Sequence, residues 1–194
     1  EAHPPTNLHV LIGRNGVGKS RLLNLMTRSL VGRPSKSRPS GEFLSVTPDD
    51  DSTPFANLVS VSFSAFDDFD LLPEKKDKTD GIQYSYIGLR RASGQRVGTP
   101  KTANMLAKEF AKSVALCLRS GRGNRWRRSL EMLEADPIFK DAEATLLMET
   151  QVSDELSPRA AKLFNSLSAG HKIVLLTMTR LVEAVEEKTL VILD

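Results

Sequence analysis

The sequence contains little that could hold a chain together by cross-links or metal ions. Cys117 is the only cysteine, which excludes an intrachain disulfide framework, and His3 and His9 are too scattered to suggest a metal site. No apolar run approaches the ~20 residues that a membrane-spanning helix needs. Residues 1–6 lack the basic and apolar stretches of a secretion signal. We therefore expect a cytoplasmic chain without a membrane partner, whose fold depends on a hydrophobic core.

Positive and negative charges nearly balance in the sequence. The net charge of +3 is too small to predict nucleic-acid binding by itself. The positive charge is unevenly placed, however, because five arginines and Trp126 lie between Arg119 and Arg128. This arginine cluster fits contacts with nucleic-acid phosphates or with an acidic protein partner. The simpler interpretation is a solvated helix end, which basic side chains favour, with Trp126 anchoring it to the core.

The hydrophobic pattern predicts a sheet. Two short apolar runs, Leu8–Ile12 and Thr189–Leu193, predict buried strands. Valine and phenylalanine alternate with serine from Val59 to Ser64, and a similar alternation runs from Ile82 to Tyr86. Alternation is typical of half-buried strands, so we expect an antiparallel part of the sheet here.

Helical spacing fills most of the remaining chain. Apolar positions recur from Lys19 to Leu30, where Gly32 follows as a stop, and again from Val174 to Val185. Between them, residues 101–149 predict two or three helices broken near Gly121–Gly123 and at Pro137, and another helix begins near Ser157. The chain of 194 residues therefore predicts one α/β domain, with a mixed sheet flanked by helices.

A phosphate-binding motif lies between the first strand and the first helix. Residues 13–20 read GRNGVGKS, the P-loop or Walker A pattern. Its glycines let the backbone approach phosphates, and the loop amides and helix N-terminus point at the anion. Lys19 would reach the β- and γ-phosphates of ATP, and the Ser20 hydroxyl would coordinate Mg²⁺. The predicted nucleotide contacts in this segment are Gly13, Arg14, Asn15, Gly16, Val17, Gly18, Lys19, Ser20 and Arg21.

Two later motifs indicate which class of ATPase this is. Thr189–Asp194 reads TLVILD, the form of a Walker B strand whose terminal carboxylate holds the magnesium shell, so Asp194 is the second predicted metal ligand. Residues 167–172 read LSAGHK, which resembles the signature of ABC ATPases. Ser168 can cap a helix there, and Gly170 leaves the backbone open to a phosphate. Ser168 lies 26 residues before Asp194, with one amphipathic helix between them, which is close to the arrangement in that family.

The chain thus resembles the ABC-type heads of stand-alone bacterial AAA-domain ATPases, allied to SMC and RecF-like repair ATPases and to OLD nucleases. The resemblance implies a P-loop NTPase fold with a sheet lobe at 1–100, a helical subdomain at 101–166 and the signature helix with the Walker B strand at 167–194. It also implies a head-to-tail homodimer, in which Ser168 and Gly170 of one copy meet the ATP held by the other. Lys19, Asp194 and Ser168 are then the catalytic residues. Many members of the group act in DNA repair or phage defence beside a partner such as a nuclease.

The sequence departs from this pattern in places. In the family a glutamate that polarises the attacking water follows the Walker B aspartate, and the sequence given stops at Asp194, so we expect a segment of a longer protein. The signature has Ala169 and His171 where transporters usually have glycine and glutamine. Two alternatives stay open: the nucleotide-binding subunit of a transporter, and an ATP sensor whose closed dimer serves as a scaffold without hydrolysis.

Overall fold

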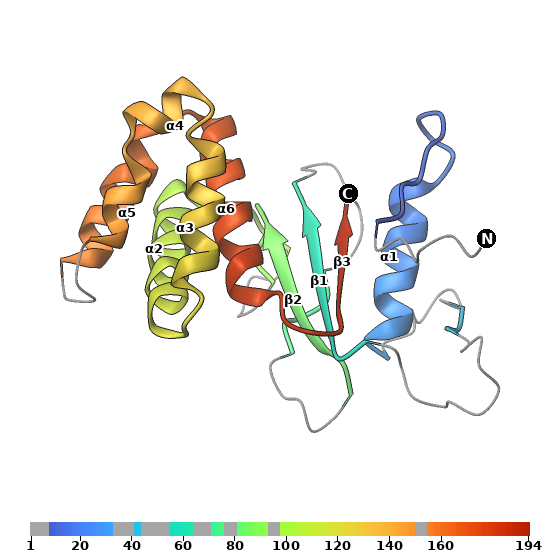
Figure 1. Ribbon diagram of the computed structural model, residues 1–194. Coiled ribbons are helices and arrows are strands. Elements are labelled where there is room, and N and C mark those ends of the chain that lie inside the picture. The colour runs from blue at the N-terminus through green and yellow to red at the C-terminus, as the bar shows by residue number, and fades with distance from the viewer. Residues whose placement is uncertain are drawn as a thin grey trace, which may run out of the picture.

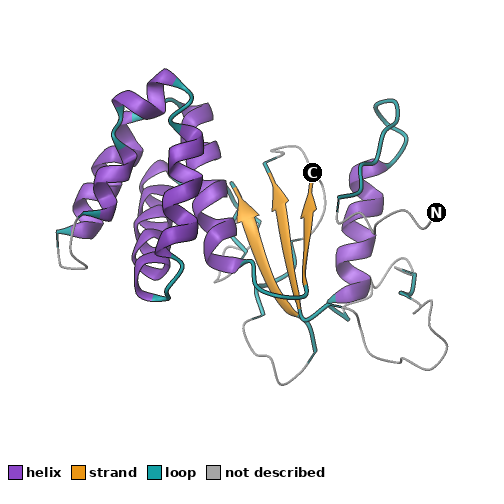
Figure 2. Ribbon diagram, in the orientation of Figure 1, coloured by secondary structure: helices purple, strands orange, loops and turns teal. Residues whose placement is uncertain are grey.

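The computed structural model describes residues 8–32, 41–43, 55–63, 71–75, 81–92, 98–149 and 155–194. They form a three-stranded sheet with one helix on one side and a helical lobe on the other (Figures 1 and 2). In chain order the elements are α1 (Lys19–Leu30), β1 (Asn57–Ser62), β2 (Gln83–Gly88), α2 (Ala103–Arg119), α3 (Gly123–Leu133), α4 (Pro137–Asp141), η1 (Ala144–Met148), α5 (Leu156–Ser166), α6 (Ala169–Ala184) and β3 (Thr189–Leu193).

The three strands of the described segments are parallel, in the order β2-β1-β3, and only isolated bridges such as that of Lys75 with Tyr84 are antiparallel. Asn57 pairs with Gln83 on one side and with Thr189 on the other. The predicted antiparallel part, and with it the mixed sheet, was therefore wrong. Residue alternation reports which face of a strand is polar, but it carries no information on strand direction. The connection from β1 to β2 is long enough for a crossover, which a parallel pair requires.

Both faces of the sheet are covered. Side chains of one face pack against Leu23, Met26 and Leu30 of α1, and those of the other face pack against Leu181 and Ala184 of α6. The first face presents Leu58, Tyr84, Tyr86 and Ile192, and the second presents Val59, Val61 and Ile87. Double coverage is the usual condition of a parallel sheet.

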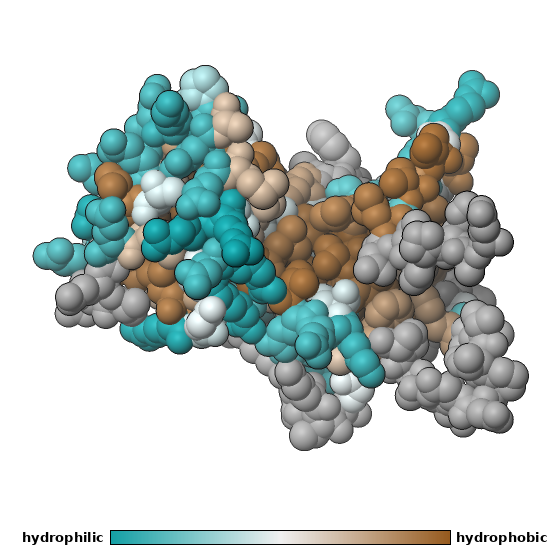
Figure 3. Space-filling model, viewed as in Figure 1, coloured by the Kyte–Doolittle hydropathy of each residue, from teal (hydrophilic) through white to brown (hydrophobic). Residues whose placement is uncertain are grey.

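The predicted first strand, Leu8–Ile12, was also wrong. These residues form no strand, and their apolar side chains are exposed, with Ile12 92% accessible and Leu8 77% accessible. Hydrophobicity alone cannot make a strand, since a strand also needs a backbone partner for its N–H and C=O groups. The space-filling view shows apolar surface, drawn brown, between the helical lobe and α1 (Figure 3).

The helical lobe has a core of its own. The fully buried side chains of Phe110, Trp126 and Phe164 belong to it, and the rings of Phe110 and Phe164 stack with centroids 5.2 Å apart. Breaks fall where the sequence predicted them. Gly121 takes a left-handed φ of 72° between α2 and α3, and Pro137 begins α4 behind an Asp136 cap.

Helix α6 joins the lobe to the sheet. Leu175, Leu176 and Val182 lie in the helical core, whereas Leu181 and Ala184 pack on the sheet. The indole N–H of Trp126 donates to the hydroxyl of Thr179 on α6 at 3.0 Å, so Trp126 is an anchor, as expected. No helix in the described segments is both long and apolar enough to cross a bilayer.

Candidate functional site

The glycine-rich segment 13–18 leads into α1 with its backbone open. Gly16 and Gly18 have φ of 84° and 96°, values that favour glycine, and a Cβ at either position would meet no neighbouring atom within 4 Å. Gly18 caps α1 without a side-chain hydrogen bond, and the first turn holds no acidic residue. The first-turn amides therefore have no side-chain cap, which leaves them suited to an anion.

The Lys19 ammonium lies against this segment. It donates hydrogen bonds to the carbonyl oxygens of Gly13 at 2.9 Å and Arg14 at 3.1 Å. An ammonium group has three donors, so one remains for a ligand. The other predicted contacts, Arg14, Asn15, Val17 and Arg21, lie in the exposed part of this segment and at the start of α1.

The two predicted metal ligands meet in space. The Ser20 hydroxyl donates to Asp194 Oδ1 at 2.8 Å, although the two residues are 174 positions apart in sequence. Asp194 follows the last residue of β3, and its backbone N–H donates to Val61 O at 3.0 Å, which fixes it to the neighbouring strand. Ser20 is in the first turn of α1, so the pair lies where α1 begins and β3 ends (Figure 1).

A small cavity of about 50 Å³ adjoins this pair, lined by residues that the sequence interpretation did not include. Ser60, Ser62 and Tyr86 face it from the strands, together with Arg90. For the three strand residues the only sequence signal is alternation, which predicts a half-buried strand and not a site. Burial raises the pKa of neighbouring Tyr84 to about 12, against a hydrogen bond with Ser60 that lowers it, so this phenol stays protonated at neutral pH.

The donors suit magnesium with a phosphate ligand. Mg²⁺ prefers oxygen donors and is usually held by one or two protein groups, with phosphate oxygens and waters completing the octahedron. One hydroxyl and one carboxylate meet that description. In the described segments no cluster of three or more His, Cys, Asp or Glu side chains could hold a metal by protein ligands alone.

The signature residues lie elsewhere in the chain. Ser168 caps α6 by accepting the His171 N–H at 3.4 Å, and its hydroxyl shares a 2.6 Å hydrogen bond with His171 Nδ1. His171 Nε2 lies 3.4 Å from Asp136 Oδ2, beside α4. The Ile138 backbone N–H and then His171 hold the pKa of Asp136 below its usual value. Ser168 and Gly170 are exposed at the N-terminus of α6, and the helical lobe to which α6 belongs lies across the sheet from α1 (Figure 1).

The arginine cluster divides into two groups. Arg125 donates to the carbonyl oxygens of Val182 and Val185 at the end of α6, and Arg122 pairs with Glu186. These two side chains join α3 to the end of α6, a role that neither interpretation of the cluster predicted. The side chains of Arg119, Arg127 and Arg128 are exposed.

The chain is 35% identical to the protein ea59 of Escherichia phage lambda over 224 aligned positions, which cover 98% of this chain and 39% of that protein. The chain thus spans about two fifths of the length of this relative. No known protein-family profile and no solved structure matches the chain.

The absence of a structural match also corrects the predicted fold. The sequence predicted a P-loop NTPase with a mixed sheet and a helical subdomain bearing the ABC signature. The structure is instead a small α/β domain with three parallel strands and six α-helices in its described segments, and it matches no solved P-loop NTPase. Short motifs specify local backbone geometry, whereas the rest of a fold depends on pairings that they do not encode.

Proposed function

We propose that this chain binds ATP with Mg²⁺ where α1 and β3 converge. The observation that supports this most directly is the Ser20–Asp194 hydrogen bond of 2.8 Å. A hydroxyl at a helix N-terminus and a carboxylate at a strand end are the two protein ligands that Mg²⁺ takes beside nucleotide phosphates.

The neighbouring groups suit the phosphates. The uncapped amides of α1 and the remaining donor of Lys19 supply partial and full positive charge next to the proposed metal position. When bound, the metal would neutralise phosphate charge. Lys19 would hold the terminal phosphates, and Gly16 and Gly18 would allow the backbone to follow them.

We further propose hydrolysis by two copies arranged head to tail, as the resemblance to ABC-type heads implies. Ser168 and Gly170 are exposed at the N-terminus of α6 and lie away from the chain's own glycine-rich segment. Both features suit contact with the nucleotide of another copy. ATP would then close the pair and hydrolysis would release it, driving or gating a partner such as a nuclease. The assignment to DNA repair or phage defence, and a nucleic-acid contact through Arg119, Arg127 and Arg128, stay predictions.

The metal site is tested by a double-mutant cycle. We expect Ser20→Ala and Asp194→Asn each to weaken Mg·ATP binding about 10- to 100-fold, the usual loss on perturbing a metal site. The double variant should lose little more than either single one, because both act through one ion. Ser29→Ala, at the other end of α1, is the matched control. Additive losses, or equal losses without Mg²⁺, would contradict a shared metal.

The trans arrangement needs a separate test. Oligomeric mass by light scattering and phosphate release are followed with and without ATP for wild type, Ser168→Arg and the control Ser166→Arg. Loss of assembly and turnover in Ser168→Arg alone, with ATP still bound, supports the head-to-tail pair. ATP-dependent assembly without phosphate release would instead favour the sensor. A Ser168→Arg variant that behaves like wild type would reduce LSAGHK to a helix cap.

A further inference from the structure

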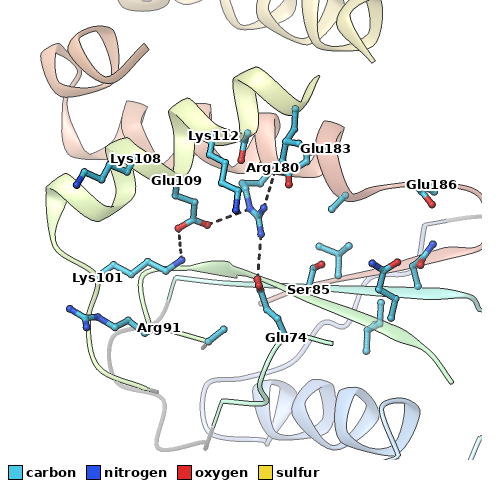
Figure 4. Close-up of a pocket in the computed structure, with 18 of the residues that line it drawn as sticks. Glu74, Ser85, Arg91, Lys101, Lys108, Glu109, Lys112, Arg180, Glu183 and Glu186 are labelled. Atoms are coloured by element: carbon cyan, nitrogen blue, oxygen red, sulfur yellow. Dashed lines mark hydrogen bonds and ion pairs between the residues drawn. The ribbon is translucent and has the colours of Figure 1, made fainter. Parts of the chain in front are cut away.

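A larger cavity lies on the other face of the sheet. It has a volume of about 760 Å³ and lies between β1 and β2 on one side and α2 and α6 on the other (Figure 4). This volume is within the range of small-molecule sites. Asp194 and Ser20 line the smaller cavity on the α1 face, so the two cavities are separate.

An ion network occupies the centre of the larger cavity. Arg180 of α6 contacts carboxylates from three segments: Glu183 at 2.9 Å, and Glu74 and Glu109 at 3.4 Å each. Glu109 also pairs with Lys101 at 2.7 Å. Burial alone would lower the pKa of Arg180, but Glu183 and Glu109 raise it above its usual value. The carboxylates therefore keep Arg180 charged, and they pair with Arg180 and Lys101 rather than with the other cations of the lining.

Three cations of the lining have no such partner. Among the described residues, no side-chain hydrogen bond or ion pair is made by Arg91, Lys108 or Lys112. Lys108 and Lys112 are one turn apart on α2, a spacing at which like charges repel. Figure 4 shows Lys112 extending toward the Arg180 network, with Lys108 and Arg91 toward one end of the cavity. The lining holds six basic side chains, Arg91, Lys101, Lys108, Lys112, Arg122 and Arg180, against four carboxylates.

One buried polar atom of the lining also lacks a partner. Arg91 Nε is inaccessible to solvent, and no acceptor for it lies among the described residues. Arg91 lines the cavity. A buried donor beside unpaired cations is costly unless something supplies acceptors.

We propose that this cavity binds a small phosphorylated ligand, held by Lys108 and Lys112 of α2 and by Arg91. A phosphate group carries up to two negative charges and several acceptor oxygens. It can therefore engage cations from two segments at once, the lysines of α2 and the guanidinium of Arg91. The site is independent of the proposed ATPase activity, because it lies on the opposite face of the sheet.

The test uses inorganic pyrophosphate as the probe and the full chain with Lys19→Ala, which removes the lysine of the glycine-rich segment. Titration calorimetry should give saturable binding at one site per chain. Lys108→Ala with Lys112→Ala should weaken it at least tenfold, as expected for lost hydrogen bonds to charged groups. The Arg91 Nε–H resonance should also shift on binding in the NMR spectrum.

The matched control removes two exposed lysines of the same lobe, Lys140→Ala with Lys162→Ala, so the net charge changes equally. Unchanged affinity in the control and loss in the α2 pair support the site. Equal weakening in both pairs would mean nonspecific attraction, and absence of saturable binding would overturn the proposal outright. Citrate is titrated in parallel, and tighter binding of citrate than of pyrophosphate would overturn the phosphate assignment.

Discussion

Removing the hydrogen bond between Trp126 and Thr179 tests how the helical lobe is held to α6. Both residues are 0% exposed, and the indole N–H donates to the threonine hydroxyl at 3.0 Å. Thr179→Val keeps the shape of the side chain but leaves the N–H buried without an acceptor, which costs about 1–3 kcal/mol. In a Trp126→Phe background no N–H is left, so the same substitution should cost close to nothing. The two changes should therefore be coupled by at least about 1 kcal/mol.

The assay is urea unfolding followed by far-UV circular dichroism, which works with or without the tryptophan. The four proteins of the cycle are compared at a common urea dependence of the free energy of unfolding, since a changed slope would signal a changed unfolded state. An equal cost of Thr179→Val in both backgrounds would refute the reasoning and leave α6 joined to the lobe by apolar packing and by the contacts of Arg125 and Arg180.

Three further perturbations follow from particular contacts. Burial raises the pKa of the Cys117 thiol to about 12, so only about one thiol in 10⁴ is ionised at pH 8. A disulfide reagent should therefore label Cys117 far more slowly in the native chain than in the unfolded one, because only the thiolate reacts. Equal labelling rates would contradict this burial. Gly88→Ala should destabilise by about 3 kcal/mol, because its Cβ would lie 2.1 Å from Ser62 O, whereas Gly170→Ala, with open space, should not; thermal melts with equal midpoints would refute the clash. Arg125→Met should lower the melting temperature through the uncapped carbonyls of α6, and an unchanged midpoint would show that water replaces the guanidinium.

Helices and strands could be predicted where neighbouring residues mark their beginning and end. Helix α1 has the predicted bounds Lys19–Leu30, because glycines flank it and its apolar residues keep helical spacing. Strand β3 also has the predicted bounds, Thr189–Leu193. Ser20 and Asp194 were predicted as partners from their motifs alone, and the structure brings them within 2.8 Å.

Features that depend on pairing between distant segments could not be predicted. The direction of β1 and β2 depends on the path of the connection between them, and residue alternation does not record that path. Residues 8–12 are as apolar as β3 but lack a strand partner, so they stay exposed. Arg90 and Ser62 carry no motif, and only the packed sheet places them beside Asp194.

The unbroken length of helix α6 affects how its N-terminal end can move. It runs without a break for 16 residues, about 24 Å at 1.5 Å per residue, from its Ser168 cap to the turn before β3. A rigid rod of that length acts as a lever, so tilting it by about 10° about its C-terminal end would displace the Ser168 end by about 4 Å. The ion pairs of Arg180 hold α6 about three quarters of the way from its N-terminal to its C-terminal end. A change that breaks these ion pairs could therefore move the Ser168 end of α6 by about 4 Å at such a tilt.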